Sequence, residues 1–177
     1  MQIYFISKEI SGTIEMLISK KSILIILALL SVLSCGKKYN NEEIEPNNTI
    51  SSATLIETGK ECKGFLDSEN DVDNYLLRID EEQLVRIELS GVKGVNHSIH
   101  VWKLVSGNPR PLKTIDDNRK SSPEEMANLF LEPGDYIIMV NHGSRDVKKG
   151  NSENSYTLRV TSRSALKEEK EPNDRAE

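Results

Sequence analysis

Short runs in which apolar and polar residues alternate limit the fold of this chain more than any other feature. Val85, Ile87 and Leu89 alternate with the charged residues Arg86 and Glu88, and five further segments repeat this period of two. Successive side chains of a β-strand point to opposite faces of a sheet, so the pattern predicts strands with one buried face. The six predicted strands are centred on residues 62–66, 75–79, 85–89, 99–105, 136–140 and 156–160.

Turn-forming residues separate these runs. Gly107 with Pro109, and the pair Pro133-Gly134, interrupt the alternation where a chain reversal is needed. The stretch 121–128 could hold one helical turn, because its Ser-Pro-Glu-Glu sequence suits a helix start. No apolar period of 3.6 residues is sustained elsewhere in the predicted domain. About seven to nine short strands joined by turns predict an all-β fold, an antiparallel β-sandwich.

Length and net charge limit the number of domains and the kinds of binding partner that we expect. The 177 residues, 37% of them hydrophobic, suffice for one globular domain with a modest core. The formal net charge is −5, and no basic patch with interleaved aromatic residues is visible, so nucleic acid is not an expected partner. The mild acidity favours divalent cations over anionic surfaces as binding partners.

The N-terminal residues have the pattern of a targeting signal. Lys20-Lys21 precede the apolar run 23–33, which is too short to span a bilayer and is typical of a secretory signal peptide. The run ends in Val-Leu-Ser-Cys-Gly at 32–36, which resembles a bacterial lipobox. Residues 1–34 are therefore predicted to be the signal peptide, with Met16 as the expected translation start. The alternative is an ordinary signal peptide in which Cys35 is incidental.

Lipidation of Cys35 would place the protein in the cell envelope. Two acyl chains hold a protein stably on a membrane, because each buried methylene contributes about 0.8 kcal/mol. We expect an anchor to a bacterial membrane, at the outer membrane or the cell surface. The polar segment 35–42 is predicted to be a tether between this anchor and a domain spanning 43–164.

An acidic Glu-x-Glu-Pro-Asn motif occurs twice. It covers residues 43–47 and returns at 169–173, about one domain length later. The second copy lies in the charged tail 165–177, which is predicted to be disordered and resembles the start of another module. Two explanations stay open: a shortened tandem array, or a linker that lends its ligands to a neighbouring molecule.

Several motifs follow one another along the chain: Glu-Pro-Asn-Asn at 45–48, Gly64, Asp-Val-Asp-Asn-Tyr at 71–75, the strand 84–89 and Pro-Gly-Asp-Tyr at 133–136. Their order resembles the bacterial pre-peptidase C-terminal domain, which is similar to the collagen-binding domains of clostridial collagenases. The resemblance covers about residues 43–162 and implies a jelly-roll-like sandwich that binds and stabilises rather than catalyses.

Oxygen-bearing residues at the start of the predicted domain suit a calcium ion, which takes six to eight oxygen ligands. Alternation along an extended segment puts Glu43, Glu45 and Asn47 on one side, and Pro46 favours that extended shape. The collagen-binding branch of the resembling family binds calcium at matching acidic positions. Carried over by position, this predicts a site of Glu43, Glu45, Asn47, Asn48, Asp71 and Asp73. The alternative is a solvated acidic linker without metal.

Other residues with reactive side chains do not form a recognisable catalytic site. His97 and His100 are three apart, which puts them on opposite faces of a strand and makes them poor joint ligands. No Gly-x-Ser-x-Gly or His-Glu-x-x-His motif occurs, so an enzyme is not expected. Cys62 is predicted to be a buried apolar residue. Trp102 is expected in the core, with exposure beside His100 and Leu104 as the alternative.

These features predict a non-catalytic, membrane-anchored lipoprotein with a calcium-binding module. Its expected partners are the membrane through the lipid, and extracellular matrix, a polysaccharide or an envelope protein through the domain. The alternative is a structural accessory or a fragment of a larger secreted protease, without a ligand of its own.

Overall fold

The computed structural model describes residues 39–144 and 147–165, which form nine strands and one short 3-10 helix. The all-β fold expected from the alternating pattern is confirmed. In chain order the elements are η1 (Ile50–Ser52), β1 (Thr54–Ile56), β2 (Glu61–Gly64), β3 (Val72–Ile79), β4 (Gln83–Leu89), β5 (His97–Val105), β6 (Asn108–Ile115), β7 (Glu124–Leu131), β8 (Gly134–His142) and β9 (Tyr156–Ser164).

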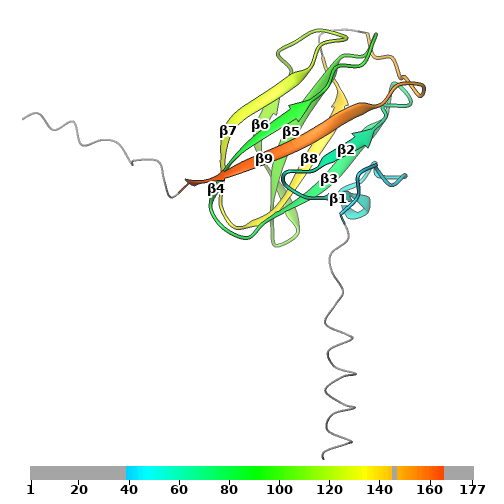
Figure 1. Ribbon diagram of the computed structural model, residues 1–177. Coiled ribbons are helices and arrows are strands. Elements are labelled where there is room, and N and C mark those ends of the chain that lie inside the picture. Colours follow the sequence, from blue (N-terminus) through cyan, green and yellow to red (C-terminus); the bar gives the residue numbers. More distant parts are fainter. Residues whose placement is uncertain (1–38, 145–146, 166–177) are drawn as a thin grey trace, which may run out of the picture. The chain divides into compact units, whose positions relative to one another are not determined.

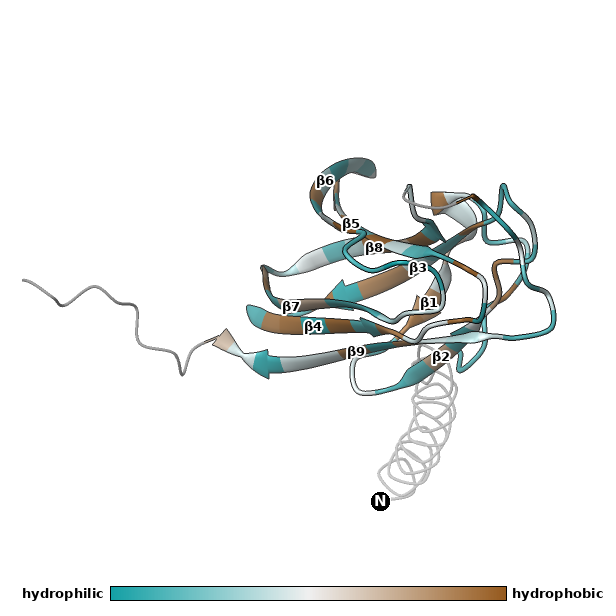
Figure 2. Cartoon of the chain, turned by 90° about the horizontal axis from the view of Figure 1, so that it is seen from above, coloured by the Kyte–Doolittle hydropathy of each residue, from teal (hydrophilic) through white to brown (hydrophobic). Residues whose placement is uncertain are grey.

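The strands form two sheets that pack face to face (Figures 1 and 2). One sheet has the order β1-β3-β8-β5-β6 and the other the order β2-β9-β4-β7. All neighbouring strands are antiparallel except β1, which runs parallel to β3. The structure is therefore the predicted β-sandwich, with one parallel pair at the edge of the five-stranded sheet.

The core lies between the two sheets and follows the alternation of the sequence. On β4, Val85, Ile87 and Leu89 are buried, while Arg86 between them is exposed. Cys62 is 2% exposed in the core, as predicted, and its thiol is free. Three tyrosines occupy fully buried core positions on three different strands: Tyr75, Tyr136 and Tyr156.

Three strands differ from the sequence-based expectation: the three-residue strand β1, which was not predicted, and β6 and β7. The stretch 121–128 was expected to hold a helical turn, but Glu124–Leu131 is strand β7, whose Met126 and Leu131 enter the core. The Glu124 carboxylate instead accepts hydrogen bonds from the backbone N–H groups of Asp117 and Asn118, which holds the preceding loop. Strand β6 was missed because it is an almost fully exposed edge strand and shows no alternation.

Trp102 was expected in the core and lies instead on the outer face of the five-stranded sheet. Its register partner is Ile137 on β8, and neither side chain belongs to the core cluster. The adjacent Val101 does belong to it, so the period of two puts Trp102 on the same outer face as His100. His97 faces inward, with its ring edge-on to Tyr156 at 5.6 Å, so the predicted separation of the two histidines is confirmed.

The N-terminal segment joins both sheets before the first strand begins. The backbone of Asn41 and Glu43 hydrogen-bonds to Lys63 at the edge of β2, in the four-stranded sheet. After the short helix η1, β1 pairs with β3 in the five-stranded sheet. Part of the segment expected as a tether is thus attached to the domain, and residues 43–47 are held across the end of the sandwich.

Three predictions fall on residues that the structure does not describe: the signal peptide 1–34, lipidation of Cys35 and the second acidic motif. Within the described ranges, no helix has the length and apolar character needed to cross a membrane.

Candidate metal site

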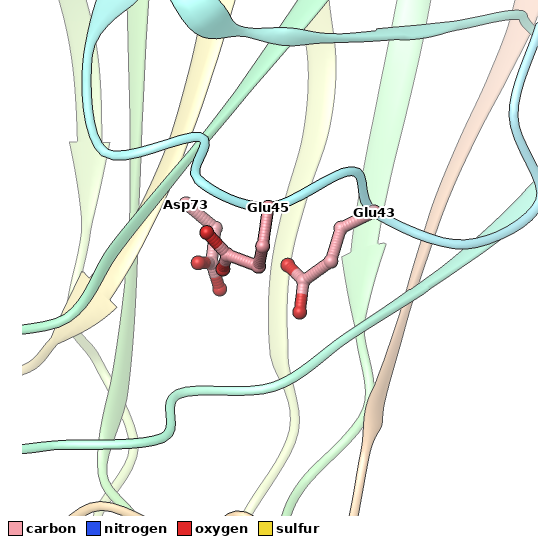
Figure 3. Close-up of side chains that lie close together, drawn as sticks. All are labelled: Glu43, Glu45 and Asp73. Carbon is pink, nitrogen blue, oxygen red and sulfur yellow. The ribbon is translucent and has the colours of Figure 1, made fainter.

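Three carboxylates meet at the end of the sandwich where the N-terminal segment crosses from one sheet to the other. Glu43, Glu45 and Asp73 each offer an oxygen, and these oxygens all lie within 4.8 Å of one another (Figure 3). Glu45 is exposed, Glu43 is half-buried and Asp73 is fully buried. Like charges at this separation repel each other, so the arrangement favours a shared cation or bound protons.

Backbone pairing explains why the two glutamates turn inward together. The N–H of Glu43 donates to the carbonyl of Lys63 at 2.8 Å, and the N–H of Ile44 donates to the Thr54 hydroxyl at 3.0 Å. These bonds keep the segment extended, so Glu43 and Glu45 share one side while Ile44 points to solvent. Asp73 reaches the same place from β3, on the core-facing side of the strand.

Asn47 joins the cluster from inside. Its side-chain amide donates to Glu43 Oε2 at 3.2 Å, and its backbone N–H donates to Glu45 Oε2 at 2.9 Å. Asn47 is fully buried, and its Oδ1 and the Oδ1 of Asp73 have no hydrogen-bond partner among the described residues. Buried oxygens without a partner are costly, and hard oxygens are what calcium prefers, so these residues fit such an ion.

The other two predicted ligands, Asn48 and Asp71, lie beside this group but are engaged with each other. The Asn48 amide donates to Asp71 Oδ1 at 3.4 Å, and the N–H of Asp67 donates to Asp71 Oδ2 at 2.6 Å. The Asp71 carboxylate therefore holds the loop before β3. Asp71 lies outside the group of three carboxylates.

Two core tyrosines, which the sequence did not single out as site residues, connect the carboxylates. The Tyr156 hydroxyl oxygen lies 2.5 Å from Asp73 Oδ2, the Tyr75 hydroxyl oxygen lies 3.0 Å from Glu43 Oε2, and the two hydroxyl oxygens are 2.6 Å apart. Three contacts between oxygens need three protons, but two hydroxyls carry only two. Without a cation, one of the carboxyl groups must therefore hold the third proton.

The effect of burial on the pKa of the carboxyl groups agrees with this count of protons. Desolvation raises the pKa of Glu43 to about 7, and it raises the pKa of Asp73 to about 9, with the negative charge of Glu43 adding to the effect at Asp73. The cluster thus holds protons at neutral pH when it holds no cation. A divalent ion would replace them and allow both carboxylates to ionise.

Comparisons with known proteins give matches among solved structures only. No family model and no curated protein sequence matches the chain. Among solved structures, it is similar to the pre-peptidase C-terminal domain of collagenase from Bacillus anthracis, at 22% identity and a TM-score of 0.51, covering 65% of this chain and all of that one. It is also similar to PliG of Aeromonas hydrophila, a periplasmic inhibitor of g-type lysozyme, at 16% identity and a TM-score of 0.42, covering 63% and 97%.

The likeness to the collagenase domain confirms the fold that the ordered motifs implied. The described domain has the architecture of a pre-peptidase C-terminal domain.

Proposed function

We propose that this chain is a non-catalytic, lipid-anchored extracytoplasmic protein whose pre-peptidase C-terminal-like module binds calcium and, through its surface, a partner outside the cytoplasm. The single observation that carries the proposal is the convergence of Glu43, Glu45 and Asp73, together with the unpaired buried oxygen of Asp73. Ionised carboxylates in a solvated linker repel one another, so their convergence on one point supports a shared cation.

The metal would stabilise the fold by linking two parts of the domain. Glu43 and Glu45 belong to the segment that crosses between the sheets, whereas Asp73 belongs to β3. A cation held by all three would fix the N-terminal segment to the sandwich. A calcium site in an extracellular module typically has a dissociation constant on the order of 10⁻⁴–10⁻³ M.

The remaining parts of the proposal come from the sequence. The lipobox-like run ending at Cys35 supports a membrane anchor, and extracellular matrix, a polysaccharide or an envelope protein are the proposed partners of the domain. The domain resembles a non-catalytic part of a collagenase in fold, which is compatible with a binding role.

A thermal shift tests the metal site. With about 10 mM calcium and the affinity above, preferential binding to the folded state adds about 1.4–2.7 kcal/mol to the free energy of unfolding. The midpoint should rise by about 4–10 °C relative to EDTA. Glu45→Gln should remove most of this rise, because Glu45 is exposed and its loss hardly disturbs the core.

Glu69→Gln is the matched control, since Glu69 is an exposed glutamate in the loop before β3 and outside the cluster. This variant should keep the full calcium response. An equal midpoint in calcium and EDTA for the unmodified protein would refute the metal site.

A further inference from the structure

The outer face of the five-stranded sheet carries a row of apolar side chains that crosses all five strands (Figure 1). The register pairs Leu55 on β1 with Leu76 on β3, and Leu76 with Ile137 on β8. Ile137 in turn pairs with Trp102 on β5, and Trp102 pairs with Pro111 on β6. Side chains of paired residues on one face are neighbours, so these five residues form a continuous band, which we call the outer row.

The outer row is partly open to solvent. Ile137 is fully buried between its neighbours, whereas Pro111 at the end of the row is exposed. Half-buried apolar side chains occur at five positions of this sheet face: Leu55, Leu76, Trp102, Leu104 and Met139. The described residues therefore leave an apolar surface on the outside of the domain, and such surfaces mark contacts with a partner or a membrane.

The two outer faces of the sandwich differ in charge. On the four-stranded sheet, outward positions of every strand hold charged side chains: Glu61 on β2, Arg159 on β9, Arg86 and Glu88 on β4, and Glu125 on β7. On β1, β3, β8 and β5, the only lysine, arginine, aspartate or glutamate side chains at outward positions are Arg78 and Asp135. These two form an ion pair with each other at 3.5 Å, so the face that carries the outer row is neutral.

The N-terminal chain reaches the domain at the edge of this same sheet. The Asn40 N–H donates to the Leu55 carbonyl at 3.2 Å, so the chain is attached to β1 beside the first residue of the outer row. Only residues 36–38 separate Cys35 from Tyr39, the first described residue. An extended chain spans at most about 3.6 Å per residue, so a lipid on Cys35 would keep Tyr39 within about 14 Å of the membrane surface.

This reach is short compared with the size of the domain. A compact domain of this length has a radius of gyration of about 14 Å, so it cannot stand clear of the bilayer on such a tether. Some part of its surface near β1 must lie against the headgroups.

The chemistry of the two outer faces selects which one turns toward the membrane. The N-terminal segment also bonds to Lys63 on β2, so its attachment alone would allow either face. Placing the charged face against the bilayer would remove water from many charged groups, which is costly. The neutral face buries apolar side chains instead, and it carries Trp102, a residue type that is enriched at membrane interfaces.

We infer that the outer row is a membrane-contacting surface that lies against the headgroup region of the bilayer holding Cys35. The inference rests on the proposed function, because it requires the lipid anchor, and it adds the orientation of the domain on the membrane. The charged face of the four-stranded sheet is then directed away from the bilayer, where a partner can reach it.

The test uses Trp102, the only tryptophan of the chain, as a reporter. The full-length lipidated protein is reconstituted in vesicles of phosphatidylethanolamine and phosphatidylglycerol, whose acyl chains are either unmodified or brominated near the headgroup. Brominated lipid should quench the Trp102 fluorescence by about half, because an indole at the membrane interface lies close to these bromines.

Leu76→Glu places a charge in the outer row and should reduce this quenching at least about twofold, while the protein still sediments with the vesicles. Leu55→Glu, at the other end of the row from Pro111, is the second variant. Leu84→Glu is the matched control, because Leu84 is a half-buried leucine on the outer face of the opposite sheet, and it should keep the full quenching. Cooperative thermal unfolding verifies that each variant is folded.

The outcomes separate this inference from the proposed anchor. Protein that sediments with vesicles but fluoresces equally in both lipids overturns the inference and leaves the anchor intact. Equal loss of quenching in Leu76→Glu and Leu84→Glu also overturns it. A soluble Cys35→Ser variant that sediments as a dimer, with Trp102 of the lipidated protein unquenched, would assign the outer row to contact between two copies instead. Protein that does not sediment with vesicles refutes the anchor, and the inference with it.

Discussion

The hydroxyl oxygen of Tyr156, in the four-stranded sheet, lies 2.5 Å from Oδ2 of the Asp73 carboxyl group, in the five-stranded sheet, and the two groups are hydrogen-bonded. Both residues are fully buried. This contact links the two sheets of the sandwich, and Asp73 also belongs to the candidate metal site. Stability of the core and occupancy of the site are therefore expected to depend on each other.

Tyr156→Phe should destabilise the protein more than the loss of a hydroxyl usually does. The substitution leaves Asp73 Oδ2 buried without its hydrogen-bond partner and breaks the contact with Tyr75, which costs about 1–3 kcal/mol. Urea unfolding measures this change. Tyr136→Phe is the control, because its hydroxyl donates only to the backbone carbonyl of Glu132. Equal losses for the two variants would contradict a special role for Tyr156.

Gly64→Ala should be strongly destabilising although alanine is small. An added Cβ would lie 2.3 Å from the Tyr75 hydroxyl oxygen and 2.5 Å from Tyr156 ring and hydroxyl atoms. Forcing these groups apart costs about 1–3 kcal/mol. The neighbouring Lys63 is exposed, so Lys63→Ala should stay within about 0.5 kcal/mol of the unmodified protein in the same denaturation experiment. A similar midpoint for both variants would show that the tyrosine hydroxyls do not pack against the β2 backbone.

The predictable and unpredictable parts of the fold have different physical origins. The alternation of apolar and polar residues in β4 and β9 predicts strands, because each strand has one face in the core and one in solvent. Strand β6 carries Pro109 and Pro111 and is exposed along its length, so it shows neither alternation nor strand propensity. An edge strand tolerates proline because one row of its backbone groups has no partner strand.

The same distinction applies to the candidate site. The common side of Glu43, Glu45 and Asn47 followed from the geometry of an extended segment. Tyr75 stands two residues after Asp73, a spacing that puts both on one strand face, but this signal also fits an ordinary core residue. The hydrogen bond between Asp73 and Tyr156 joins residues that are 83 apart in the sequence. Such a contact forms only when the two sheets pack together, so no local sequence pattern predicts it.

In EDTA, stability should fall as the pH rises from 7 to 9. Burial raises the pKa of Asp73 from its ordinary 3.8 to about 9, and the pKa of Glu43 also rises. The folded state then binds more protons than the unfolded state in this range, so the free energy of unfolding decreases as protons are lost. For fully buried Asp73 the decrease is on the order of 1–2 kcal/mol.

Urea unfolding at pH 7, 8 and 9 measures this slope, and Asp73→Asn should flatten it because the amide does not titrate. His97, whose pKa burial lowers to about 4, is neutral throughout and does not contribute. Stability that is constant or increases with pH in EDTA would contradict the proposed protonation of the cluster.

Cys35→Ser should release the protein from the membrane. In a bacterium that processes lipoproteins, the unmodified chain should incorporate labelled palmitate and sediment with membranes, because two acyl chains give stable anchoring. The variant should lose both properties. Cys62→Ser is the matched control, since Cys62 is the only other cysteine and is buried in the core. Palmitate labelling that survives in Cys35→Ser would refute the proposed anchor.

A crystal structure of the domain grown in millimolar calcium tests the central claim most directly. We expect an ion within about 2.3–2.6 Å of oxygens from Glu43, Glu45 and Asp73, the range of calcium–oxygen bonds in proteins. The unpaired oxygens of Asp73 and Asn47 are the next expected ligands. Carboxyl groups that still contact only the tyrosine hydroxyls and Asn47, with no ion between them, would contradict it.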